Sequence, residues 1–178
     1  MKRVSTKTVY EGKIARVRVD EFVYTDGSTA TREVVGHPGA VAIVPHDERH
    51  LFLVRQPREA VGEEALLELP AGKLDVPGES PLECAKRELA EEIGKAASEW
   101  WELKRFFTTP GFADEEVIVY LATGLEDASV EAPDGEEERL EIVPWPLTEL
   151  DAAIEECRDS KSLIGMLLFR ELRESGGA

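Results

Sequence analysis

Three glutamates within five residues are the part of this sequence most able to do chemistry. Glu88, Glu91 and Glu92 lie in the stretch RELAEEIG, residues 87–94. Residues three and four apart are neighbours on a helix, so these like charges repel by roughly a few tenths of a kcal/mol per pair. Two explanations are open: water and salt screen a solvated helix face, or a divalent cation lies between the carboxylates. Helical periodicity does not decide between them.

If a cation binds here, the residue types indicate which one. Glu88 and Glu92 are four positions apart in the chain, so their carboxylates leave a helix on one face, one turn apart. Such oxygen ligands suit Mg²⁺ or Mn²⁺, which bind carboxylates, carbonyls, water and substrate phosphates. The loop LPAGKLD, residues 69–75, contains a glycine that permits a backbone carbonyl to approach a metal closely.

The helix that must carry these glutamates is strongly signalled. Ser80 and Glu83 have the spacing of a capping box, and Pro81 suits the first helical position. Gly94 supplies a C-terminal stop. These signals predict a helix over residues 81–93. Its expected buried residues recur at helical spacing: Leu82, Ala85, Leu89 and Ile93.

Strand signals dominate the rest of the chain. The first 36 residues show period-two apolar spacing and an Asp26-Gly27 turn, which predicts a small β lobe. The runs AVAIVP and HLFLVRQ predict two central strands in the core sheet. Further strands are expected at WWELKRFFT, EVIVYLATG and LEIVPWPL, and Pro144 and Pro146 restrict the last one to a sheet edge.

Two helices are expected after these strands, over residues 147–157 and 162–172. The second has a predicted apolar face of Leu163, Met166, Leu167 and Leu168. This order of elements predicts an α/β sandwich around a mixed sheet.

Composition limits the function classes. The 178 residues suffice for one principal domain, and the net charge of −16 argues against nucleic acid as a partner. No apolar run approaches the ~20 residues of a membrane helix, and MKRVSTKTVYEG lacks the apolar core of a secretory signal. We therefore expect a cytosolic protein with no membrane partner. Cys84 and Cys157 lack metal-ligand spacing and are expected to be ordinary, partly buried thiols.

The run GKLDVPGESPLECAKRELAEEIGK, residues 72–95, resembles the signature of the Nudix hydrolases. That signature has a glycine, a glutamate, seven residues and then REUxEExGU, where U is apolar. Six residues separate Gly72 from Glu79 where the family usually has five, and Lys95 stands at the last apolar position. Neither departure touches the glutamates. The matching residues are Gly72, Glu79, Arg87, Glu88, Leu89, Glu91, Glu92 and Gly94.

The resemblance implies a Nudix α/β/α sandwich that hydrolyses a diphosphate bond by attack of water, with Mg²⁺ or Mn²⁺ as cofactor. The glutamates then tolerate one another because cations lie between them. Glu88 and Glu92 would be metal ligands, Glu91 a further ligand or a base, and the Ala71 carbonyl another ligand. Glu79 would be a structural partner of Arg87, and Gly72 and Gly94 would be structural residues of the motif.

The flanking segments resemble the ADP-ribose pyrophosphatase group: REVVGHPGAVAIV, LVRQPREAVGEEALLELPAGKLD and TTPGFADE. A proline about fifteen residues beyond the signature marks that group, and Pro110 lies fifteen residues beyond Lys95. The resemblance implies hydrolysis of ADP-ribose to AMP and ribose 5-phosphate. It also implies a homodimer that exchanges a lobe of residues 1–36, with a hydrolase domain over residues 37–178. The alternatives are a nucleotide-sugar pyrophosphatase acting on GDP-mannose or ADP-glucose, and a non-catalytic nucleotide-binding module.

Further site residues follow from the same resemblance. The catalytic base would come from the acidic loop EEER, with Glu138 preferred, then Glu137, over Glu136, although a solvated surface loop has the same composition. Arg58 would clamp the diphosphate. Arg32 would reach the adenine or ribose end, or be an ordinary strand-edge arginine. Phe112, after Pro110, would line the terminal-ribose pocket or anchor its loop.

Overall fold

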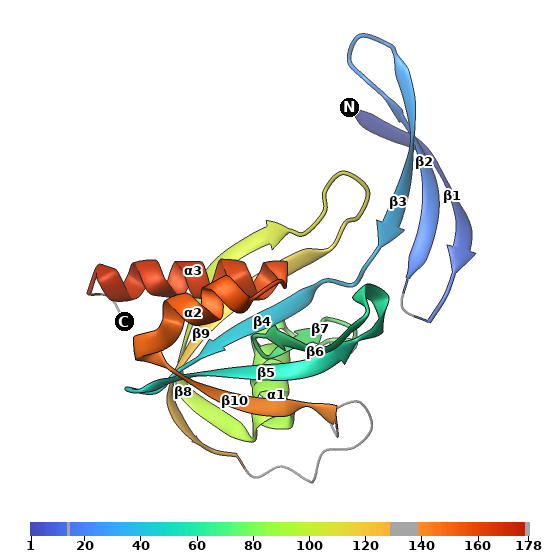
Figure 1. Ribbon diagram of the computed structural model, residues 1–178. Helices are drawn as coiled ribbons and strands as arrows, with labels where there is room; N and C mark the ends of the chain where they lie inside the picture. The colour runs from blue at the N-terminus through green and yellow to red at the C-terminus, as the bar shows by residue number, and fades with distance from the viewer. Residues whose placement is uncertain (14, 129–138, 177–178) are drawn as a thin grey trace. The chain divides into compact units, whose positions relative to one another are not determined.

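The computed structural model describes residues 1–13, 15–128 and 139–176, and the chain divides into two compact units (Figure 1). Unit 1 comprises Met1–Gly39 and Phe106–Val117, and unit 2 comprises Ala40–Arg105 and Ile118–Ala178. Within the described ranges, no helix is long and apolar enough to cross a membrane.

Unit 1 contains an antiparallel sheet in the order β1-β2-β3. The strands are β1 (Lys2–Glu11), β2 (Arg16–Val23) and β3 (Thr29–Gly36). The predicted turn between the last two is present: Gly27 has a φ of 83°, and the Asp26 carboxylate accepts hydrogen bonds from Ser28. Glycine suits this turn because a side chain disfavours positive φ.

Polar groups, more than apolar ones, organise unit 1. Asp20 is 1% exposed and accepts hydrogen bonds from Thr6 at 2.5 Å and Arg18 at 2.9 Å. Arg18 also pairs with Asp114 at 2.9 Å, and the Asp114 N–H donates to the Val35 carbonyl. The segment 106–117 is therefore joined to the sheet by ion pairs and backbone hydrogen bonds.

Unit 2 is built on two sheets, of order β7-β4-β9-β8 and β10-β5-β6. The first contains β4 (Ala40–Pro45), β7 (Ala71–Lys73), β8 (Lys95–Phe107) and β9 (Glu116–Asp127), of which the last two extend into unit 1. The second contains β5 (His50–Arg58), β6 (Glu63–Glu68) and β10 (Glu141–Pro146). The proline-containing β10 lies at a sheet edge, which confirms that prediction.

Strands β4 and β5 correct one expectation. We expected both in one core sheet, but they belong to different sheets and are linked by an isolated bridge between His46 and Leu51. The reason is that each strand already has two hydrogen-bonded neighbours, β7 and β9 for β4, and β6 and β10 for β5. Every residue of β4 is buried. The expected α/β sandwich is confirmed, because helices pack on both faces of β4.

The first helix, α1 (Pro81–Ile93), has the predicted bounds. Both hydrogen bonds of the capping box between Ser80 and Glu83 form, and Gly94 ends the helix in the left-handed conformation. The buried residues are Cys84, Ala85, Leu89 and Ile93, while the expected Leu82 is partly buried. They pack with Val41 and Ile43 of β4 in one cluster.

The last helices are α2 (Leu150–Glu156), preceded by the 3-10 turn η3 (Leu147–Glu149), and α3 (Ser160–Glu174). The predicted face of α3 was partly wrong. Met166 is buried as expected and Leu163 and Leu168 are partly buried, but Leu167 is 36% exposed, and the other buried residues are Ser162, Gly165 and Phe169. A Cβ on Gly165 would lie 2.5 Å from Leu69 and 3.3 Å from Val44. Because Gly165 has no side chain, α3 can pack closely against Leu69 and against Val44 of β4.

Candidate active site

Helix α1 carries three of the motif glutamates, and Arg87 forms ion pairs with two of them and with Glu79. Its Nε and Nη2 donate to Glu79 at 2.9 and 3.0 Å, so the pairing expected from the sequence is present. Its Nη1 donates to Glu88 and Glu91, each at 2.7 Å. The hydrogen bond from Arg87 lowers the pKa of Glu79. One guanidinium therefore sets the positions of three carboxylates.

Gly72 permits the loop before α1 to approach Glu88. A Cβ at position 72 would lie 2.0 Å from the Glu88 carboxyl carbon, a distance that no real contact allows. The glycine of the signature is therefore required by a close approach of backbone to carboxylate.

Glu92 is buried in surroundings that disfavour its ionised form. Its Oε2 accepts a hydrogen bond from the Ala71 N–H at 3.0 Å. Burial, followed by the negative charges of Glu88 and Glu68, raises the pKa of Glu92 to about 8, although the Ala71 N–H and the charge of Lys161 act in the opposite direction. A cation beside this carboxylate would relieve the penalty, because it would favour the ionised form.

The donor set fits a divalent cation that keeps part of its own hydration. Among residues that the structure describes, no three His, Cys, Asp or Glu side chains form a ready metal-binding cluster. Mg²⁺ is usually bound by one or two carboxylates together with water and substrate phosphates, without an all-protein cage. Glu88 and Glu92, one turn apart on α1, suit that mode. Their assignment as ligands, with Glu91 and the Ala71 carbonyl, stays a prediction.

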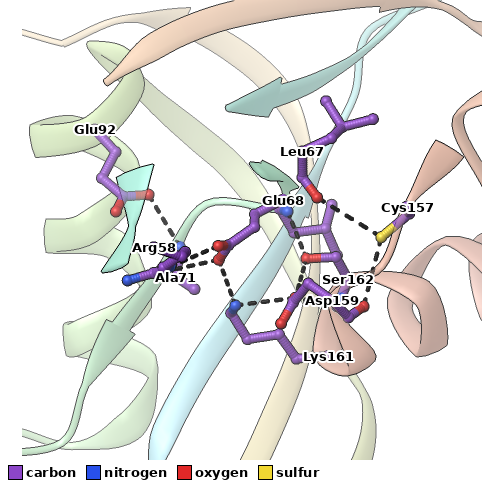
Figure 2. A network of polar contacts seen from close by, with 10 residues as sticks. Arg58, Leu67, Glu68, Ala71, Glu92, Cys157, Asp159, Lys161 and Ser162 are labelled. Carbon is purple, nitrogen blue, oxygen red and sulfur yellow. Dashed lines mark hydrogen bonds and ion pairs between the residues drawn. The ribbon is translucent and has the colours of Figure 1, made fainter. Parts of the chain in front are cut away.

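A second polar network lies beside this helix face (Figure 2). Glu68 at the end of β6 is fully buried, and Arg58 donates to its two oxygens at 2.6 and 2.8 Å. Lys161 at the start of α3 donates to Glu68 at 2.5 Å and to Asp159 at 2.9 Å. Sequence reasoning found Arg58 but missed the other three residues. A charged residue between Leu67 and Leu69, inside an apolar run, was the available signal.

Comparison with known proteins identifies the fold's family. Residues 36–162 match the NUDIX domain, and residues 1–35 match the nucleoside diphosphate sugar hydrolase N-terminal domain. This chain belongs to the Nudix family. The suspected signature is thus confirmed, and the chain is a Nudix hydrolase.

Several relatives of this Nudix hydrolase cover most of its length. It is 37% identical to the methanol dehydrogenase activator of Bacillus methanolicus, over 98% of this chain and 94% of that protein. It is 44% identical to the ADP-ribose pyrophosphatase of Mycobacterium tuberculosis, over 82% of this chain and 70% of that protein. A crystal structure of an ADP compounds hydrolase matches with a TM-score of 0.83 at 27% identity, over 99% of this chain and 96% of that one.

Three residues predicted to bind substrate belong to unit 1 of the Nudix hydrolase. Arg32 is exposed and donates to the Thr31 carbonyl. Phe112 follows Pro110 in a turn, and its side chain is 57% exposed while its backbone carbonyl accepts from Val35. Phe112 therefore anchors its loop through its backbone. The roles of all three in substrate binding stay predictions.

The predicted catalytic base lies outside the described residues, because Glu136, Glu137 and Glu138 fall within 129–138. That assignment stays a prediction as well. The two cysteines are buried free thiols, as expected. Burial is the main cause that raises the pKa of Cys84 to about 12 and also raises the pKa of Cys157, so neither thiol is activated as a nucleophile.

Proposed function

We propose that this Nudix hydrolase cleaves the diphosphate bond of ADP-ribose to give AMP and ribose 5-phosphate, with Mg²⁺ as its cofactor. The observation that carries the proposal is the 44% identity to a protein named ADP-ribose pyrophosphatase. The complete set of signature glutamates on α1 supports an enzyme over a non-catalytic nucleotide-binding module.

In this mechanism Glu88, Glu92 and the Ala71 carbonyl would hold the metal, with Glu91 as a further ligand or base. A bound Mg²⁺ or Mn²⁺ neutralises substrate charge and lowers the pKa of the attacking water. Arg87 contributes by keeping the carboxylates of Glu88 and Glu91 together on α1. Glu138, and after it Glu137, is our candidate for the base that takes the proton from water.

Arg58 would bind the diphosphate. A guanidinium matches phosphate oxygens with parallel N–H donors, so one arginine both neutralises and orients the group. The Arg58 side chain is 41% exposed. Its pKa is raised, first by the hydrogen bond to Glu68, so it stays charged at every working pH. Arg32 and Phe112 would bind the nucleoside and the terminal ribose respectively.

We further propose a cytosolic homodimer in which the lobe of residues 1–36 is exchanged between subunits and residues 37–178 form the hydrolase domain. All ten residues of β1 are exposed, and Val4, Val9 and Tyr10 are each at least half exposed. A small sheet with so little apolar burial needs a further packing surface. Light scattering at micromolar concentration should give the mass of two chains, and a monomer would refute the exchange. The two free thiols suit the cytosol.

The substrate assignment is tested by a hydrolysis panel with Mg²⁺, comparing ADP-ribose, ADP-glucose, GDP-mannose, NADH and diadenosine polyphosphates by kcat/KM. We expect ADP-ribose to lead by at least tenfold, which corresponds to about 1.4 kcal/mol of transition-state discrimination. If ADP-glucose or GDP-mannose led, the chain would be a nucleotide-sugar pyrophosphatase of other specificity. No turnover of any of them with Mg²⁺ or Mn²⁺ would favour the binding module.

A further inference from the structure

Glu68 is a buried carboxylate, and the groups around it show why it is tolerated there. A carboxylate removed from water is costly unless opposite charges and hydrogen bonds satisfy it. Glu68 has three short contacts from two cations: two from Arg58 and one from Lys161. These contacts satisfy the buried carboxylate, and they link β5, β6 and the start of α3 through its side chain.

The contact with Arg58 uses only one edge of the guanidinium. Nε and Nη2 bond to Glu68, while Nη1 donates to no other group within the part of the chain that is described. The side chain nevertheless keeps 41% of its surface exposed. One edge is thus fixed by a buried carboxylate, and the other remains available to an anion. A fixed guanidinium loses less entropy when it binds.

Lys161 and Asp159 complete the support. Lys161 is 15% exposed and bridges Glu68 and Asp159. Asp159 caps α3 by accepting from the Ser162 N–H at 2.9 Å and the Ser162 hydroxyl at 2.5 Å. The two cations and two carboxylates balance in charge, so the network needs no further counter-ion.

The network is joined directly to the loop of the Nudix site. Glu68 precedes Ala71 by three residues, and Leu69 between them donates its N–H to the Ser162 hydroxyl at 2.7 Å. Figure 2 draws Ala71, Glu92 and Arg58 in one view, and the charge of Glu92 is among the causes that raise the pKa of Arg58, so these two side chains are close. Arg58 is therefore near the helix face that carries the motif glutamates.

We infer that Glu68 is a positioning residue that orients Arg58 toward the diphosphate of the substrate, and that Lys161 holds Glu68 in place. This inference rests on the proposed function of Arg58. Glu68 would then contribute to substrate affinity although it is fully buried.

The primary test compares Glu68→Gln with Glu63→Gln. Both residues lie on β6. Glu63 is opposite Arg58 in the strand register, but its carboxylate pairs with Arg158 at the surface, so the control removes a charge near Arg58 without removing a side-chain contact to it. With ADP-ribose and Mg²⁺, we expect Glu68→Gln to raise KM at least tenfold while kcat changes less than threefold. The control should stay within twofold in both constants. A Glu68→Gln enzyme within twofold of the wild type would overturn the inference.

A double-mutant cycle with Arg58→Ala separates positioning from a general structural role. If Glu68 acts through Arg58, the variant that carries both substitutions should match Arg58→Ala alone within twofold in kcat/KM. If the two losses multiply, Glu68 acts on the reaction by another route, and the inference fails.

Glu68→Gln leaves two cations close together without their shared carboxylate, so a second variant controls for loss of folding. Glu68→Gln with Lys161→Met restores charge balance and keeps the aliphatic stem of residue 161. Relative to Lys161→Met alone, this double variant should show the same tenfold rise in KM. An unchanged KM would overturn the inference.

A binding measurement keeps this inference separate from the substrate assignment. Calorimetric titration with inorganic pyrophosphate in EDTA requires neither a metal nor a particular nucleoside. We expect Glu68→Gln to bind pyrophosphate at least tenfold more weakly than the wild type and Glu63→Gln. Equal affinities, or no binding by the wild type at millimolar concentration, would refute the positioning role. If ADP-ribose is not hydrolysed but the affinities differ as expected, only the substrate assignment fails.

Discussion

Two buried carboxylates, one in each unit, have similar partners and different surroundings. Asp20 in unit 1 accepts from Arg18, and Glu68 in unit 2 accepts from Arg58. Arg18 also donates through Nη2 to a second carboxylate, Asp114, and its side chain is 21% exposed, whereas Arg58 pairs with Glu68 and is 41% exposed. A second carboxylate of the protein covers the arginine in unit 1, whereas the arginine in unit 2 keeps more of its surface exposed. Burial of a carboxylate alone therefore does not identify a functional residue, and the exposure of its arginine partner is the feature on which our proposal for Arg58 rests.

The largest expected effect is a loss of activity when a carboxylate of the predicted metal site is neutralised. Glu92→Gln should lower kcat/KM for ADP-ribose on the order of 10³-fold, because it removes a charge that would hold the metal. The thermal midpoint of the metal-free protein should not fall, since burial already disfavours the ionised form of Glu92. Steady-state kinetics and a melting curve in EDTA check both points. An active Glu92→Gln enzyme would refute the metal site.

A backbone substitution tests the approach of the loop to α1. Gly72→Ala should lower kcat/KM on the order of 10²-fold, because the added methyl group must displace the Glu88 carboxyl that lies 2.0 Å away. The measurement is steady-state kinetics over a range of Mg²⁺ concentrations. We expect the half-saturating Mg²⁺ concentration to rise as well. Wild-type kinetics would show that Glu88 moves without consequence.

The closed ion pair of unit 1 should matter for stability. Asp20→Asn should lower the free energy of unfolding by about 2 kcal/mol, because Arg18 and Thr6 lose a charged acceptor. Asp26→Asn, in the exposed hairpin turn, is the matched control and should change it by less than about 0.5 kcal/mol. Urea denaturation followed by circular dichroism measures both. Equal changes in the free energy of unfolding would show that the buried hydrogen bonds of Asp20 do not stabilise the fold.

The smallest expected effect is a difference in pH dependence. Burial raises the pKa of Asp20, but hydrogen bonds from Thr6 and Arg18 outweigh it and leave the pKa below the ordinary 3.8. Its contribution to stability is therefore present above pH 3.8 and is lost as the pH falls through the folded-state pKa. Glu92 has the opposite sign. Its pKa rises from 4.5 to about 8, so the protonated form stabilises the fold below pH 4.5 and that contribution is lost as the pH rises through 8.

Melting curves of the metal-free protein and its variants at several pH values test this difference. Asp20→Asn should flatten the loss of stability at acid pH, and Glu92→Gln should flatten the loss between about pH 4.5 and 8. Parallel curves for both variants and the wild type would contradict the assigned signs.

Short-range signals could be interpreted correctly without a structure. The capping box, the proline at the first helical position and the terminal glycine predicted both ends of α1. The proline-rich last strand was placed at an edge, and Glu79 was paired with Arg87. The face of α3 was predicted only in part: apolar spacing identified the buried Met166 but also favoured the exposed Leu167, and it gave no sign that Gly165 packs closely against Leu69 and Val44.

The sequence by itself determined the family, the catalytic helix and its caps, because these depend on residues within a few positions of one another. Only the tertiary structure decided that β4 and β5 belong to separate sheets and that Glu68 is buried between Arg58 and Lys161. Lys161 and Glu68 are 93 residues apart in the chain. Contacts at that separation depend on which segments of the chain pack together, and the spacing of residues within one segment does not predict that packing.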